Sequence, residues 1–189
     1  AHELQANVYA FLNQENADEW LQKIQLEDKA PNAEQLRFLQ AVCNRCLTEK
    51  QEFARAIAPT VATEPERSCL LAPPGTGKSE CIKWVCRFFR DCLQWTAGVQ
   101  YQCLASQNRM ASLIAGTTFH SWGEIPIDLD YASNRDKKTT PEGYKTMFLK
   151  CAGIRWILID EISTAGLVIL GLLEKAVRKA CSSQLHASG

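Results

Sequence analysis

The segment of residues 72–80, A-P-P-G-T-G-K-S-E, contains residue types that can hold phosphate groups. A phosphate-binding turn between a strand and a helix needs inward-pointing main-chain amides, the positive end of a helix and one lysine. Gly75 and Gly77 can adopt positive φ, so the main chain can approach the phosphates closely. Lys78 can neutralise the β and γ oxygens of a nucleotide, and the Ser79 hydroxyl can bind Mg²⁺. We therefore predict that this segment binds ATP with Mg²⁺.

One position departs from the usual pattern of such a loop, G-x-x-x-x-G-K-S/T, whose first glycine would stand where this sequence has Ala72. A methyl group there is small, and it is tolerated if φ of Ala72 stays negative. The alternative is a chance glycine turn, which the apolar residues before the loop and the amphipathic pattern after it disfavour. The residues of this segment predicted to contact the nucleotide are Pro74, Gly75, Thr76, Gly77, Lys78, Ser79 and Glu80.

A second candidate lies at Asp160 and Glu161, directly after the apolar run of residues 156–159. Such a run predicts a buried strand that ends at the sheet edge where ligands bind in open α/β folds. Asp160 would hold Mg²⁺, often through water, and Glu161 would orient or deprotonate the attacking water. Alone, an Asp-Glu pair after a strand is commonly a solvated turn, but the loop around Lys78 favours the functional interpretation. Lys78 and Glu161 are therefore the predicted catalytic residues.

Strands alternate with helices on both sides of these candidates. Short apolar runs predict strands at 68–71, 99–105 and 156–159. Helices are predicted from the end of the phosphate loop to about residue 93, over 108–115, and from 140 to 153. This order predicts an α/β fold with a parallel sheet that helices cover on both faces.

The N-terminal part is predicted to be helical without strands. Residues 1–30 form a predicted helical extension, with a break at 13–16. A longer helix opens at Asn32, because Asn32 is a good N-cap and Gln35 follows three residues later, as in a capping box. The predicted organisation is thus an extension of residues 1–30 and a domain of residues 31–189.

Composition is that of an ordinary soluble globular protein, with 46% apolar and 22% charged residues. Basic and acidic residues number 21 each, so bulk electrostatics would not attract nucleic acid and any DNA contact would be local. The uncharged run of residues 162–173 is far shorter than the roughly 20 residues of a membrane helix. The N-terminus lacks the features of a signal peptide. We expect a soluble intracellular protein with no membrane partner.

The nine cysteines are predicted to pack as small apolar residues rather than to bind metal. Cys43 and Cys46 form one C-x-x-C pair, and no second pair follows at zinc-site spacing. An odd number of cysteines also fits a reducing compartment.

Four segments together resemble one family, the Pif-type and RecD-like superfamily 1 DNA helicases. They are residues 32–35 (N-A-E-Q), 72–79 (A-P-P-G-T-G-K-S), 116–121 (G-T-T-F-H-S) and 159–163 (I-D-E-I-S), and the resemblance covers about residues 32–180. It implies a RecA-like P-loop NTPase domain of an ATP-dependent helicase that acts on single-stranded DNA, in the nucleus or mitochondria. It also implies that Gln35 contacts adenine, that 116–121 lies near DNA and that Asp160 holds the metal.

Several of these assignments have alternatives. Gln35 can be a capping residue rather than an adenine contact. His120 and Trp122 can be packed aromatics, although Trp122 could also stack on a base. Asn108 and Arg109 stand where the family has a different, T-G-x-A-A-like stretch; they could bind phosphate oxygens or begin a solvated helix.

The largest expected departure from the family is that its second RecA-like domain is missing from this chain. No Gly-Asp pair follows Glu161, as the family's G-D-x-x-Q phosphate sensor would require. Because an arginine finger from such a domain can contribute a factor of about 10³ to 10⁵ in related systems, we expect this chain to bind ATP better than it hydrolyses it. The alternatives are another P-loop ATPase, of the AAA type, and a non-catalytic nucleotide-dependent interaction module.

Overall fold

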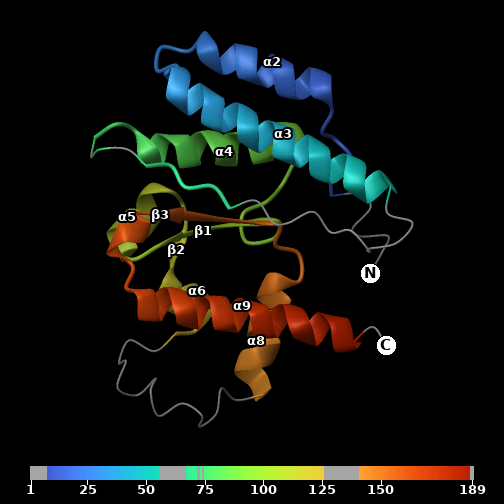
Figure 1. The fold of residues 1–189 in the computed structure, drawn as a ribbon, viewed down its shortest axis with the longest axis vertical. Coiled ribbons are helices and arrows are strands. Elements are labelled where there is room, and N and C mark those ends of the chain that lie inside the picture. The colour runs from blue at the N-terminus through green and yellow to red at the C-terminus, as the bar shows by residue number, and fades with distance from the viewer. Residues whose placement is uncertain (1–7, 56–66, 72, 74, 126–140, 188–189) are drawn as a thin grey trace. The chain divides into compact units, whose positions relative to one another are not determined.

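The computed structural model describes residues 8–55, 67–71, 73, 75–125 and 141–187 (Figure 1). The chain folds as two compact units, Ala1–Trp95 and Thr96–Gly189. The predictions for Ala72 and Pro74 lie outside the described residues. The predicted boundary at residue 30 stays a prediction.

Three helices make up most of the first unit: α2 (Gln14–Gln25), α3 (Ala33–Arg55) and α4 (Lys78–Leu93). Each packs against the other two (Figure 1). Residues 8–11 form turns rather than the predicted helix. The predicted break at 13–16 instead holds the start of α2, because the Asn13 side chain accepts a hydrogen bond from the Asn16 amide at 2.8 Å.

The first unit has an apolar core built from one face of each helix. Ile24 of α2, Leu39 of α3 and Phe89 of α4 are fully buried there. Aromatic rings fill much of the space between the helices, with Phe89 and Trp95 centroids 5.0 Å apart and Trp20 and Phe88 centroids 5.2 Å apart. Such ring pairs add to the stabilisation that comes from burying apolar surface.

The second unit holds a three-stranded parallel sheet in the order β2-β1-β3. Its strands are β1 (Tyr101–Ala105), β2 (Thr117–Thr118) and β3 (Trp156–Asp160). The central strand β1 is buried along its whole length, and Ala105 pairs with both Thr118 and Asp160. A Cβ on Gly116 would lie 2.5 Å from the Cys103 carbonyl oxygen, so only glycine lets β2 come this close to β1. The predicted parallel sheet is therefore confirmed.

Helices flank this sheet within the second unit. They are α5 (Asn108–Leu113), α6 (Phe119–Gly123), α8 (Pro141–Cys151) and α9 (Leu167–Ala187), with a 3₁₀ turn, η1 (Ile162–Thr164), after β3. Leu104, Phe119 and Leu173 belong to one buried cluster that joins β1, α6 and α9. The fold is thus mixed α/β, as predicted.

The predicted strand at 68–71 is wrong. None of its residues pairs with another strand among those the structure describes, and Leu71 is 86% exposed. Cys69 is exposed as well, so it does not pack as predicted. An apolar run makes a strand only where a neighbouring strand supplies hydrogen-bond partners, and the described sheet is formed by three other segments.

Three of the predicted helices match the structure closely, unlike the one expected before residue 13. α4 and α8 lie within one or two residues of their predicted bounds, and α3 begins directly after its predicted cap. The uncharged run of residues 162–173 is only partly buried, since Leu173 joins the core whereas Leu167 is 87% exposed.

Among the helices described, none combines the length and apolar character needed to cross a membrane.

Candidate nucleotide site

The loop before α4 has the backbone conformation that its glycines predicted. Gly75 and Gly77 have φ of 78° and 85°, in the left-handed region that favours glycine. Gly77 is also the N-cap of α4, a position where it provides no side-chain cap. Lys78 and Ser79 are therefore the first two residues of a 16-residue helix, next to its partial positive charge. The loop and the helix that follows it thus match the prediction, whereas the strand expected before them does not form.

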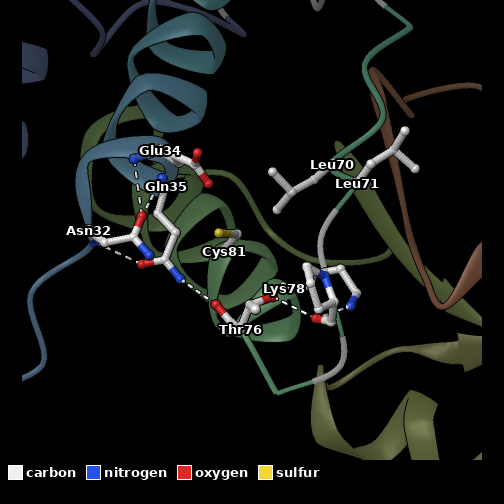
Figure 2. A pocket seen from close by; sticks show the side chains of 9 residues that line it. Asn32, Glu34, Gln35, Leu70, Leu71, Thr76, Lys78 and Cys81 are labelled. Atoms are coloured by element: carbon white, nitrogen blue, oxygen red, sulfur yellow. Dashed lines mark hydrogen bonds between the residues drawn. The ribbon is translucent and has the colours of Figure 1, made fainter.

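Side chains of the loop turn toward the loop's own main chain. The Lys78 ammonium donates to the Pro73 carbonyl oxygen at 3.0 Å, and the Thr76 hydroxyl donates to the same oxygen at 2.7 Å (Figure 2). A phosphate oxygen is a stronger acceptor for an ammonium than a neutral carbonyl is. The Lys78 head group is thus held close to the loop, where an arriving phosphate could replace the carbonyl.

Gln35 links the start of α3 to this loop. Its Oε1 accepts the Asn32 amide at 2.9 Å, and Asn32 Oδ1 accepts the Gln35 amide at 2.9 Å, which completes a capping box. The Gln35 Nε2 also donates to the Thr76 carbonyl oxygen at 3.1 Å (Figure 2). The capping interpretation of Gln35 is therefore confirmed, and the contact to the loop is one that the sequence did not predict. The adenine contact stays a prediction.

A small cavity of about 170 Å³ lies between the start of α3 and the loop (Figure 2). Its lining combines polar groups with apolar side chains and consists of Asn32, Glu34, Gln35, Leu70, Leu71, Pro73, Thr76, Lys78 and Cys81. Pockets that enclose a drug-sized ligand measure roughly 300 to 1,000 Å³, so this cavity has room for part of a nucleotide. Glu80 does not line it; its exposed side chain pairs with Lys83 at 2.7 Å.

The second unit places Asp160 at the carboxyl end of a parallel strand, as the sequence predicted. The strand itself is not buried as predicted, since residues 156–159 are only half-buried and β3 lies at the edge of the described sheet. Asp160 is the last residue of β3, pairs with Ala105 of β1 and is only 4% exposed. Buried carboxylates are rare unless they have a partner or hold a metal. Ligand sites in parallel α/β sheets lie at this same end of the strands.

Glu161 has an unusual backbone conformation. Its φ is 52° and its ψ is 50°, which strains a residue that has a side chain by roughly 1 to 3 kcal/mol. The turn that follows stabilises it, because Thr164 donates to the Glu161 carbonyl oxygen through both its amide at 3.0 Å and its hydroxyl at 2.8 Å. The Ser163 hydroxyl donates to the Glu161 carboxylate at 3.2 Å. Strain of this kind is often found at functional residues.

Sequence reasoning missed two hydroxyl residues at this edge. The Ser106 hydroxyl, directly after β1, is hydrogen-bonded to the Thr164 hydroxyl. The only signal for Ser106 was its position, since parallel strands that end at one edge bring their following residues together.

The predicted DNA contacts divide into packed and exposed residues. Trp122 is 6% exposed and belongs to the core cluster of the second unit, so the packed alternative is the one observed. His120 is half-buried, with its Nδ1 3.1 Å from the Ile125 carbonyl oxygen. Asn108 and Arg109 are exposed in the first turn of α5. Stacking of a base on Trp122 would require this core to open.

Six of the cysteines are buried, as predicted: Cys43, Cys46, Cys81, Cys92, Cys103 and Cys151. Burial raises the pKa of Cys43 to about 12 and that of Cys92 to about 11, so both thiols stay protonated at neutral pH. No group of three or more potential metal-binding side chains occurs in the described part of the chain.

The lysine loop thus belongs to the first unit and the acidic strand end to the second. Comparison of the chain with protein-family models, curated proteins and solved structures gives no significant match. Functional inference therefore depends on the residues and their geometry.

Proposed function

We propose that this chain is the ATP-binding part of a P-loop ATPase, in which the loop of residues 75–77, with Lys78 and Ser79, holds the phosphates of MgATP. The observation that supports this most is the conformation of the loop, where two glycines in the left-handed region lead into the first turn of α4 beside Lys78. A single phosphate group would then be attracted by the main-chain amides of the loop, by the positive end of the α4 dipole and by the Lys78 ammonium.

The donors that would hold Mg²⁺ are oxygen atoms, as that ion requires. In the first unit the proposed donor is the Ser79 hydroxyl at the start of α4. For the second unit, the resemblance to helicases proposes the buried Asp160 carboxylate as a metal donor. When bound, Mg²⁺ would neutralise charge on the β and γ phosphate oxygens. Glu161 follows Asp160 directly and has a strained backbone, and its carboxylate would act as the base toward the attacking water.

The resemblance of four segments to superfamily 1 helicases supports coupling of ATP hydrolysis to movement along single-stranded DNA, with a second RecA-like domain as partner. Arg109 and Asn108 are exposed and fit contacts to phosphate oxygens. The burial of Trp122 favours a second candidate, a nucleotide-dependent module that does not stack DNA bases. DNA-stimulated hydrolysis in a longer chain that includes a partner domain would separate the two.

Titration calorimetry with MgATP tests the nucleotide site. We expect Lys78→Ala to weaken binding by about a hundredfold, because removal of a charge-assisted contact to an anion costs about 2 to 5 kcal/mol. The matched control is Lys83→Ala, which removes the same charge from an exposed position on the same helix. Wild-type chain without affinity for MgATP, or equal affinities for the two variants, would refute the proposal.

A further inference from the structure

The amide of Gln35 makes two hydrogen bonds that have different consequences. The oxygen accepts the Asn32 amide and belongs to the cap of α3, whereas the nitrogen donates to the Thr76 carbonyl, 41 residues away in the chain. Only the second bond reaches the loop that carries Lys78. The two ends of one planar amide therefore connect a helix start to the phosphate loop (Figure 2).

The same chain offers an internal comparison. Asn16 occupies the equivalent third helical position in the capping box of α2, where its Oδ1 accepts the Asn13 amide at 3.0 Å. Its Nδ2 also donates to a carbonyl, but that carbonyl belongs to Phe11, five residues earlier. Capping therefore does not require a bond to a distant loop, and the bond from Gln35 to Thr76 needs another explanation.

The close approach of Gln35 to the loop also depends on glycine. A Cβ on Gly77 would lie 2.7 Å from the Gln35 Nε2, so the end of the Gln35 side chain would have to move away from the loop. Gly77 thus meets two requirements, a left-handed φ and space for the Gln35 amide. The amide is packed directly against the peptide that joins Thr76 to Gly77.

This contact sets the direction of that peptide. The described chain contains only trans peptide bonds, and in a trans peptide the C=O and the following N–H point in opposite directions. A Thr76 carbonyl held by Gln35 therefore turns the Gly77 N–H away from α3. If the carbonyl were released and rotated inward, its negative end would oppose a phosphate where a donor is needed.

We propose that Gln35 is a positioning residue that orients the phosphate loop through the Thr76 carbonyl, so that it supports binding of the triphosphate whatever base is attached. This inference depends on the proposed nucleotide site. It differs from an adenine contact in one measurable way: loss of Gln35 should weaken a triphosphate that has no base as much as it weakens ATP.

Calorimetry with MgATP and with Mg-tripolyphosphate tests this on the full chain. We expect Gln35→Ala to weaken both ligands about five- to tenfold, the usual effect of one hydrogen bond, and to leave the ratio of their affinities unchanged. Asn16→Ala is the matched control, because it removes a capping amide of the same kind and should leave both affinities unchanged. A loss confined to ATP would show that Gln35 recognises adenine and would overturn the inference.

Gln35→Glu separates the loop contact from the helix cap. Glutamate is favoured at this capping-box position and keeps an acceptor for the Asn32 amide, but it cannot donate to Thr76. We expect Gln35→Glu to bind both ligands as weakly as Gln35→Ala does. The loss of affinity should persist in about 1 M salt, where charge repulsion is screened within about 3 Å. Full rescue by glutamate, or unchanged binding in both variants, would overturn the inference and leave the proposed site intact. Wild-type chain that binds neither ligand would refute the site itself.

Discussion

In the first unit the loop around Lys78 keeps its shape through two glycines and a few side-chain hydrogen bonds, whereas in the second unit Asp160 is fixed by the pairing of β3 with β1. The loop residues Gly75 and Thr76 are exposed, and Asp160 is buried. A few polar bonds at an exposed site can be exchanged for bonds to a ligand at low cost. Asp160 ends an edge strand, but its backbone can move only if the pairing with Ala105 is disturbed.

The two halves should therefore respond to different kinds of substitution. Changes in packing should affect the acidic strand end through the stability of its unit. Changes in loop backbone should affect ligand binding more than changes in packing do, with a smaller loss of stability. The following tests compare these two responses.

Leu104→Ala, in the sheet of the second unit, should give the largest effect, which is a loss of folding stability. Leu104 is fully buried in β1, between β2 and β3, and removal of such a side chain costs about 3 kcal/mol. Denaturant unfolding, with amide exchange of β1 and β3, measures the loss. Leu113→Ala is the control, because Leu113 is exposed on α5 and the same change there should cost less than about 0.5 kcal/mol. Equal losses would show that the ladder around Asp160 is not the tightly packed element described.

Gly77→Ala, in the loop of the first unit, should give the next largest effect, which is a loss of MgATP affinity. An alanine there would need a left-handed φ, at about 1 to 2 kcal/mol, and its Cβ would displace Gln35. We expect MgATP affinity to fall about ten- to a hundredfold, while the unfolding free energy falls by about 1 to 2 kcal/mol through the strained φ. Gly98→Ala is the control, since Gly98 has φ of 81° with open space around it. If Gly98→Ala lowered the affinity equally, backbone strain in general and not the loop would be responsible.

The smallest expected effect is a loss of folding stability at alkaline pH. It depends on a thiol in the core of the first unit and not on the loop. Burial raises the pKa of Cys43 to about 12, so the folded chain keeps a proton that the unfolded chain releases above about pH 9. The unfolding free energy should therefore fall as pH rises from about 9 to 12, by about 1 kcal/mol from this thiol at about pH 10. Denaturant unfolding against pH measures this.

Cys43→Val should make the alkaline decline shallower, because valine has no proton to lose. Cys69→Val is the control, since Cys69 is exposed beside the loop and its replacement should leave the profile unchanged. A profile that responded to Cys69 rather than Cys43 would contradict the packing of the first core.

Local patterns predicted much of the structure. Periodic apolar residues indicated the helices α3 and α4, start and stop signals indicated α8, and the capping signals at Asn32 indicated the start of α3. Glycine at 75 and 77 predicted positive φ in the loop, and the run before Asp160 predicted a strand, although that strand is half-buried rather than buried. These features depend on neighbours in the chain, so a linear pattern contains enough information to infer them.

Other features depended on residues far apart in the sequence. The apolar run at 68–71 had the composition of a strand, but a strand also needs partners, and pairing is decided by where other segments lie. Trp122 had the residue type of a stacking platform, and only packing against β1 and α9 showed that it is buried. The bond from Gln35 to Thr76 joins residues that no short motif connects.

The sequence alone thus determined the chemistry available to this protein: a lysine and a serine at a helix start, glycines before them, and a carboxylate at the end of a strand. Residue type and local spacing are enough for that. The tertiary structure decided which of these groups are buried, which carbonyl Gln35 holds and which apolar run joins the sheet. Those outcomes depend on packing and hydrogen bonds between segments that are distant in the sequence. Such contacts exist only when the chain has folded.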